Sequence, residues 1–195
     1  MVLKRDVNYI VSGIERSGTS LLMQMLQAGG VPIGFDRSRP SDAHNPKGYF
    51  ELEGGKIINR LQEGTFPLSV YAGKFIKITA YGLQFLPQGK YAIIYSERHI
   101  EEILDSMERM MGKPDEHRQE TKTSFLKLNM HIKDTINKRK DMRVLYVTYN
   151  EIVSQPKKHI QRIAAFLDMP ASNANAMMQV VDGALYRQRR DIKKS

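Results

Sequence analysis

The sequence contains no cysteine among its 195 residues. Disulfide bonds and metal sites built on thiolates are therefore excluded. It also lacks any apolar run that approaches the length of a membrane-spanning helix. The first thirteen residues already enter a predicted strand, which leaves no room for a secretory signal. Together these absences favour a cytoplasmic protein with no membrane span.

Acidic residues are outnumbered by basic ones, 21 against 30, which gives a net charge of +9. This excess favours an anionic ligand. Five basic side chains lie in the last nine residues, RQRRDIKKS, but no aromatic residues are interleaved with them, and no zinc finger or other nucleic-acid signature is present. We therefore expect a small polyanion as the ligand and no nucleic acid. The length and the 41% apolar content fit a single globular domain over residues 1–195.

A glycine-rich turn, GIERSGTS, occupies residues 13–20 directly after the apolar run YIVS. Four residues separate Gly13 from Gly18, which is the spacing of a phosphate-binding loop. The backbone N–H groups of such a turn, and the N-terminus of the helix after it, attract anions. Three side chains can add hydrogen bonds to a phosphate group: Ser17, Thr19 and Ser20.

The loop departs from that of nucleotide triphosphatases, because Thr19 occupies the position of their lysine. Those enzymes also hold Mg²⁺ with an Asp that follows a later strand. Here the strand YAIIY runs into Ser96 and Glu97 instead. Arg16 offers a replacement charge that can hold a phosphate-like group without a metal. The five histidines form no pair at helical spacing, so we expect no metal site.

The order of the apolar segments predicts an α/β fold. Strands are predicted over 9–12, 31–35, 74–78, 91–95 and 144–148, and helices after the loop and over 100–111, 116–139 and 156–170. Residues 36–66 are predicted to be irregular. This alternation indicates a three-layer fold of the P-loop type, with a mostly parallel sheet of about five strands and helices on both faces. Ligands of such sheets bind at the carboxyl ends of the strands, where the loop falls.

The segment RSGTSLL, placed after a strand, resembles the 5′-phosphosulfate loop of sulfotransferases that use 3′-phosphoadenosine 5′-phosphosulfate (PAPS), in particular tyrosylprotein sulfotransferases and bacterial members. The segment IIYSERHIEEILDSM is similar to the stretch in which this family holds the 3′-phosphate of the donor. The resemblance assigns that role to Arg98 and Ser106, eight positions apart.

Further segments resemble the same family in the same order. FIKIT supplies Lys77 at a strand end, and YNEIVSQP supplies Tyr149, which the resemblance places near the nucleotide, although Asn150 stands where the family usually has Glu. NPKGYFE and IQRIAAFLDMP are similar to a segment of bacterial members and to the closing helix of the family. Basic residues close over the donor in many members, and the matching candidates here are Arg187, Arg189 and Arg190.

The resemblance implies metal-independent, in-line transfer of a sulfuryl group from PAPS to a hydroxyl or amine. Lys77 would then stabilise charge on the leaving oxygen. The general base stays open among Asp36, Glu51 and His44. Two other functions also stay open: a P-loop kinase acting on a small molecule, and a non-catalytic basic module that binds phosphate or nucleic acid.

Overall fold

The computed structural model describes residues 3–43 and 45–183. Within them, one parallel sheet has the order β2-β1-β3-β4. Its strands are β1 (Asn8–Gly13), β2 (Phe75–Lys77), β3 (Tyr91–Glu97) and β4 (Met142–Thr148). This parallel sheet confirms the expected α/β architecture. The two strands with near-continuous apolar runs, β1 and β3, lie in the middle of the sheet and are buried on both faces.

The sheet has four described strands where the sequence predicts about five. The segment predicted as a strand over 31–35 forms only an isolated bridge, between Ile33 and Phe75. The backbone bonds there run from Phe75 N–H to the Pro32 carbonyl and from Gly34 N–H to the Phe75 carbonyl. Pro32 has no N–H with which to extend the hydrogen-bond ladder to β2, so this segment does not form a strand although it is apolar.

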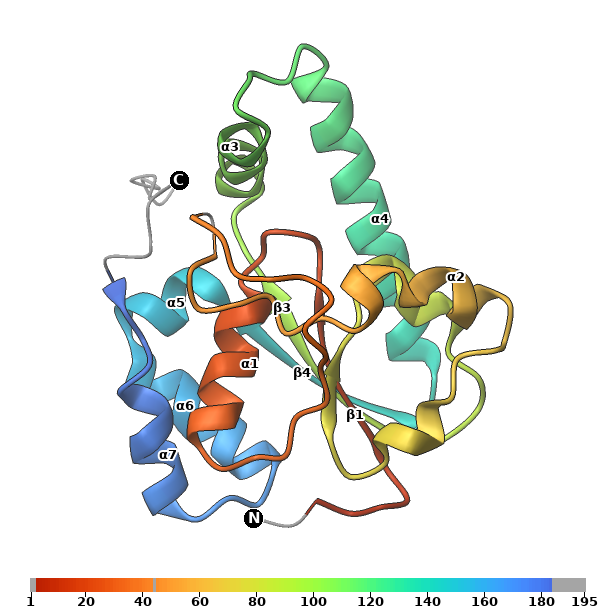
Figure 1. Cartoon of the computed structure of the whole chain (residues 1–195), viewed down its shortest axis with the longest axis vertical. Coiled ribbons are helices and arrows are strands. Elements are labelled where there is room, and N and C mark those ends of the chain that lie inside the picture. Colours follow the sequence, from red (N-terminus) through yellow and green to blue (C-terminus); the bar gives the residue numbers. More distant parts are fainter. Residues whose placement is uncertain (1–2, 44, 184–195) are drawn as a thin grey trace.

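Helices cover both faces of the sheet (Figure 1). The helices are α1 (Thr19–Ala28), α2 (Ile57–Gln62), α3 (Ile100–Met111), α4 (Arg118–Lys138), α5 (Tyr149–Ser154), α6 (Pro156–Phe166) and α7 (Ala171–Met178), and the 3₁₀ turns are Glu53–Gly55, Leu68–Tyr71 and Ala80–Phe85. Within the segment predicted as irregular, 36–66, the short α2 forms because Ile57 and Leu61, one turn apart, are both buried.

Two apolar clusters fill the space between the layers. Val11 and Ile94 point to one face of the sheet and pack with α1, α6 and α7, whereas Ile10 and Ile93 point to the other and pack with α2, α3 and α4. Neighbouring residues in a strand point to opposite faces, so adjacent positions in the sequence divide between the two clusters. These clusters include buried residues of α1, α4 and α6, such as Leu22, Ile132 and Ile160.

Ion pairs join α3 and α4, which form a helical hairpin. Arg118, at the start of α4, contacts three carboxylates of α3, those of Glu101, Asp105 and Glu108, at 2.7–2.8 Å. Gly112 ends α3 with a φ of 70°, in the left-handed region that glycine adopts readily. The contacts of Arg118 hold α4 against α3, the helix that carries Ser106. No helix in the described ranges is long and apolar enough to cross a bilayer.

Candidate functional site

The loop between β1 and α1 is held tightly against its neighbours. Gly18 has a φ of 102°, and a Cβ at this position would collide with the ring of Tyr149. Ser96, in β3, donates a hydrogen bond of 2.7 Å from its hydroxyl to the Ser17 carbonyl. Arg16 also adopts a positive φ, 65°, which is uncommon for a residue with a side chain. These contacts hold the loop in this backbone conformation, in which the first residues of α1 line a pocket.

A pocket of about 300 Å³ lies in front of this loop, at the carboxyl ends of the strands. Gly13 ends β1, Lys77 ends β2, Arg98 follows β3 directly and Tyr149 follows β4 directly, and all four line the pocket. Other residues that line it include Arg16, Thr19, Ser20, Arg39, Asn45, Tyr49, Glu51, Ser106, Arg109 and Met110. The sheet thus gathers residues distant in sequence at the place where parallel sheets bind ligands.

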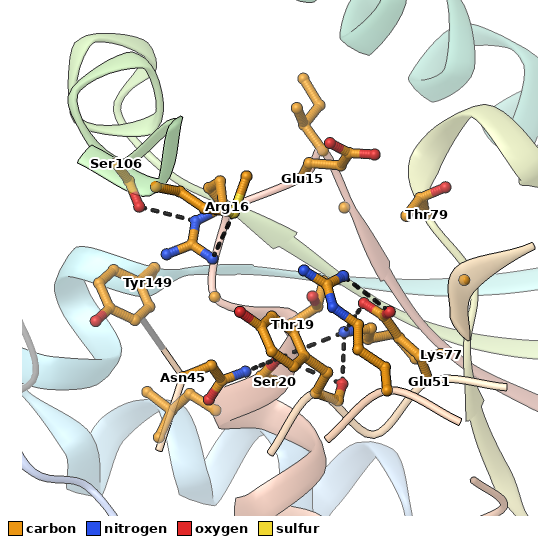
Figure 2. Close-up of a pocket in the computed structure, with 18 of the residues that line it drawn as sticks. Glu15, Arg16, Thr19, Ser20, Asn45, Glu51, Lys77, Thr79, Ser106 and Tyr149 are labelled. Carbon is orange, nitrogen blue, oxygen red and sulfur yellow. Dashed lines mark hydrogen bonds and ion pairs between the residues drawn. The ribbon is translucent and has the colours of Figure 1, made fainter. Parts of the chain in front are cut away.

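Lys77 is buried at one side of the pocket, with 5% of its side chain exposed. Its ammonium nitrogen lies 2.9 Å from Glu51 Oε1, 2.6 Å from the Tyr49 carbonyl oxygen and 3.4 Å from Ser20 Oγ (Figure 2). Burial lowers the pKa of Lys77, and the carboxylate of Glu51 opposes that shift. The lysine is therefore a paired cation beside the first turn of α1.

Glu51 bridges two cations. Its second oxygen accepts a hydrogen bond of 3.0 Å from Arg39, whose guanidinium carbon lies 3.6 Å from the centre of the Tyr49 ring. The Tyr49 hydroxyl in turn donates to Asp42 at 2.8–2.9 Å. Asn45 also donates to Ser20 Oγ, at 3.0 Å. The segment that includes NPKGYFE therefore folds over the pocket and is tied to α1 and β2.

Arg98 and Ser106 lie at the opposite side, with Arg16 between them. Arg98 donates through Nη1 to the Arg16 carbonyl at 3.1 Å and through Nε to Glu102 at 3.0 Å. The Ser106 hydroxyl accepts a hydrogen bond of 2.9 Å from Arg16 Nε. The guanidinium of Arg98 covers the ring of Tyr149, 4.6 Å from its centre. Figure 2 shows Arg16, Ser106 and Tyr149 on one side, Lys77 and Glu51 on the other, and Thr19 and Ser20 between them.

Some residues named from the sequence lie elsewhere. Asp36 does not line the pocket, because its carboxylate accepts the backbone N–H groups of Ser38 and Glu53 at 2.8 and 2.7 Å. The bond from Glu53 is the main cause of the lowered pKa of Asp36. Ser17 is buried and does not line the pocket. The remaining candidates, His44, Arg187, Arg189 and Arg190, lie outside the described residues.

Other pocket residues were not found from the sequence. Arg39 lies in a stretch without periodicity, so no pattern singled it out. Arg109 follows Ser106 by one helical turn, which is a usable signal once Ser106 is placed in a site. Glu102, in the first turn of α3, does not line the pocket but contacts Arg98, which lies just before that helix.

A glycine turn after the first strand of a parallel sheet and a pocket at the strand ends are typical of α/β proteins that bind phosphate groups. The family is shown by the sequence, which matches the family model of the sulfotransferase domain over residues 6–191. The chain therefore belongs to the sulfotransferase domain family. No curated protein matches the sequence significantly.

Solved structures share this fold. The sulfotransferase domain of the Synechococcus PCC 7002 olefin synthase matches with a TM-score of 0.58 and 16% identity, over 98% of this chain and 91% of that domain's chain. The sulfotransferase domain from the curacin biosynthetic pathway matches with 0.54 and 14%, over 92% and 79%. Mouse sulfotransferase SULT7A1, solved with PAP, matches with 0.53 and 16%, over 97% and 68%.

Proposed function

We propose that this protein transfers a sulfuryl group from PAPS to a hydroxyl or amine acceptor, without a metal ion. One observation carries the proposal. The residues that the family motifs assign to the two ends of the donor, Lys77 at one end and Arg98 with Ser106 at the other, line one pocket around the N-terminus of α1. A family match over residues 6–191 supports the same activity.

The donor would lie across the loop. Its 5′-phosphosulfate would accept hydrogen bonds from the first turn of α1, including the side chains of Thr19 and Ser20, where backbone N–H groups and the helix dipole favour an anion. Its 3′-phosphate would lie at Arg98 and Ser106. Tyr149 would flank the nucleotide, since its ring lies between Gly18 and Arg98.

Lys77 would assist the departure of the leaving group. In the transfer the acceptor oxygen or nitrogen attacks sulfur, the bond from sulfur to the bridging phosphate oxygen breaks, and that oxygen gains negative charge. A cation beside it stabilises the transition state more than the ground state. The contact from Lys77 to Ser20 Oγ, 3.4 Å, is the longest of its three. A donor oxygen can replace that contact while the bonds to Glu51 and Tyr49 remain.

Glu51 is the general base that the geometry favours. It lines the pocket beside Lys77, and its two cationic neighbours hold its carboxylate in one orientation. Asp36 is less suited, because backbone N–H groups occupy its oxygens away from the pocket. The acceptor proton would pass to Glu51 as the new bond to sulfur forms.

The test is binding followed by turnover. Adenosine 3′,5′-bisphosphate at a hundred times its Kd should stabilise the protein by about 2.7 kcal/mol, or roughly 5–11 °C in Tm for a chain of this length. ATP with Mg²⁺ and an oligonucleotide should give no comparable shift. Sulfuryl transfer from labelled PAPS to a panel of phenols, alcohols and amines should then continue in excess EDTA. Stabilisation by ATP with Mg²⁺ alone would favour a kinase, and stabilisation by the oligonucleotide alone a nucleic-acid-binding module.

A further inference from the structure

Arg98 meets the donor as half of a buried ion pair. Glu102 is fully buried, and Arg98 keeps 6% of its side chain exposed. The carboxylate of Glu102 accepts Arg98 Nε at 3.0 Å, and both of its oxygens accept the side-chain amide of Asn150 at 3.0 Å. This carboxylate fixes the guanidinium of Arg98 in place. It also cancels the charge of Arg98, because the two side chains together carry no net charge.

A 3′-phosphate brings about 1.5–2 negative charges to this position near neutral pH. Ser106, the other residue there, is neutral, and its oxygen already accepts a hydrogen bond from Arg16. Placing a phosphate against groups with no net charge is costly, because the anion loses hydration without a compensating cation. Arg16 brings one positive charge to this end through its hydrogen bond to Ser106, and a phosphate with about two negative charges calls for a second cation.

Arg109 is placed to supply it. It lies on α3 one turn after Ser106 and lines the pocket together with Ser106 and Met110, and the Met110 sulfur accepts Arg16 Nη1 at 3.8 Å. The side chain of Arg109 is exposed. Within the described ranges it forms no ion pair, whereas Lys77 and Arg39 both pair with Glu51. Arg16 donates to Ser106 and Met110 at the same end, so among the described residues that line the pocket Arg109 is the second cation without an ion pair that can serve the 3′-phosphate.

We propose that Arg109 is a donor-binding residue that supplies positive charge for the 3′-phosphate beside Arg16, while Arg98, neutralised by Glu102, sets the geometry. This inference rests on the proposed function. It assigns Arg109 the selection of nucleotides with a 3′-phosphate over nucleotides without one. Because Arg109 is exposed, its contribution is screened by salt more strongly than that of the buried Arg98.

The experiment is calorimetric titration with adenosine 3′,5′-bisphosphate and with adenosine 5′-phosphate. Arg109→Ala should weaken binding of the bisphosphate about ten-fold, a loss typical of a charged hydrogen bond, and leave binding of adenosine 5′-phosphate unchanged. Arg109→Lys should keep most of the preference. Lys113→Ala is the matched control, since Lys113 is exposed just beyond α3, does not line the pocket and should affect neither ligand. Raising the salt concentration should shrink the gap between the parent and Arg109→Ala.

Two results would overturn the inference: an Arg109→Ala variant that keeps the parent preference for the bisphosphate, or one that binds both nucleotides equally less well. A parent protein with no preference for the bisphosphate would overturn the proposed function and this inference with it. The parent is measured first, so the two failures are distinguishable.

Discussion

Replacing Lys77 by methionine removes a buried cation while keeping a side chain of similar length. Glu51, with 12% of its side chain exposed, is left with Arg39 as its partner. Replacing Glu51 by glutamine leaves Lys77 and Arg39 together without a carboxylate. We expect each single variant to lose stability, because each leaves a desolvated charge with fewer counter-charges.

The expected loss is about 3 kcal/mol for either variant, the lower end for broken buried ion pairs, since a partner or some solvent remains. For a chain of this length this lowers Tm by roughly 6–12 °C. The double variant Lys77→Met/Glu51→Gln should recover most of the loss. It contains neither buried charge, and Arg39, with 38% of its side chain exposed, tolerates the loss of its partner at little cost.

Activity should not recover with stability. If Lys77 stabilises the leaving oxygen, kcat should fall about 10²–10³-fold in Lys77→Met, with a much smaller change in Kd for adenosine 3′,5′-bisphosphate. The kcat should fall at least as far in the double variant, which also lacks the proposed base Glu51. Thermal unfolding, titration with the bisphosphate and turnover of labelled PAPS measure the three quantities. A double variant that regains parent kcat together with parent Tm would refute the catalytic role of Lys77 and leave the pair structural.

The same pair predicts a pH effect. Burial lowers the pKa of Lys77 from its ordinary value of 10.5, and Glu51 partly opposes the shift. In Glu51→Gln that opposition is gone, so the pKa of Lys77 falls further. The protonated ammonium is the active form, so residual kcat of Glu51→Gln should decline at a lower pH than kcat of the parent. An alkaline limb at the same pH in both proteins would contradict the role of Lys77.

Three further predictions concern other parts of the chain. Arg98→Ala should reduce the preference for adenosine 3′,5′-bisphosphate over adenosine 5′-phosphate in titrations, and an unchanged preference would remove Arg98 from the site. Gly18→Ala should weaken binding of adenosine 3′,5′-bisphosphate more than ten-fold, because the φ of Gly18 is 102° and the added Cβ meets the Tyr149 ring. Gly64→Ala is the control: Gly64 has a φ of 68° and open space around it, so this variant should lose only about 1 kcal/mol of stability. Burial lowers the pKa of His159 below 6.5, so the folded state favours the neutral imidazole, and the free energy of unfolding should fall as the pH drops below that value. In urea titrations between pH 7 and 5, His159→Gln should make the free energy of unfolding depend less on pH. An equally steep dependence in the variant would assign the pH effect to other groups.

The elements that carry the phosphate site follow from local signals in the sequence. The spacing of Gly13 and Gly18 after an apolar run indicated the loop, and the fold places it at the end of β1. The long apolar runs of β1 and β3 indicated a sheet buried on both faces, which is what the structure shows. The strand predicted over 31–35 is wrong. The segment is as apolar as a strand, but Pro32 has no N–H for a ladder, and the segment forms only one bridge, at Ile33.

What the sequence determined by itself is therefore the order of the four described strands and of helices α1, α3, α4 and α6, the phosphate loop, and the family motifs that contain Lys77, Arg98 and Ser106. Only the tertiary structure decided which side chains share the pocket. Arg16 meets Ser106 across 90 positions of sequence, and Lys77 meets the carbonyl of Tyr49 across 28. Periodicity reports which face of its own element a residue occupies. Periodicity carries no information on how an irregular segment such as 36–56 packs over a sheet, because this packing depends on contacts between residues distant in sequence. The folded chain alone therefore shows that Glu51 bridges Lys77 and Arg39, and that Arg109 is exposed beside Ser106.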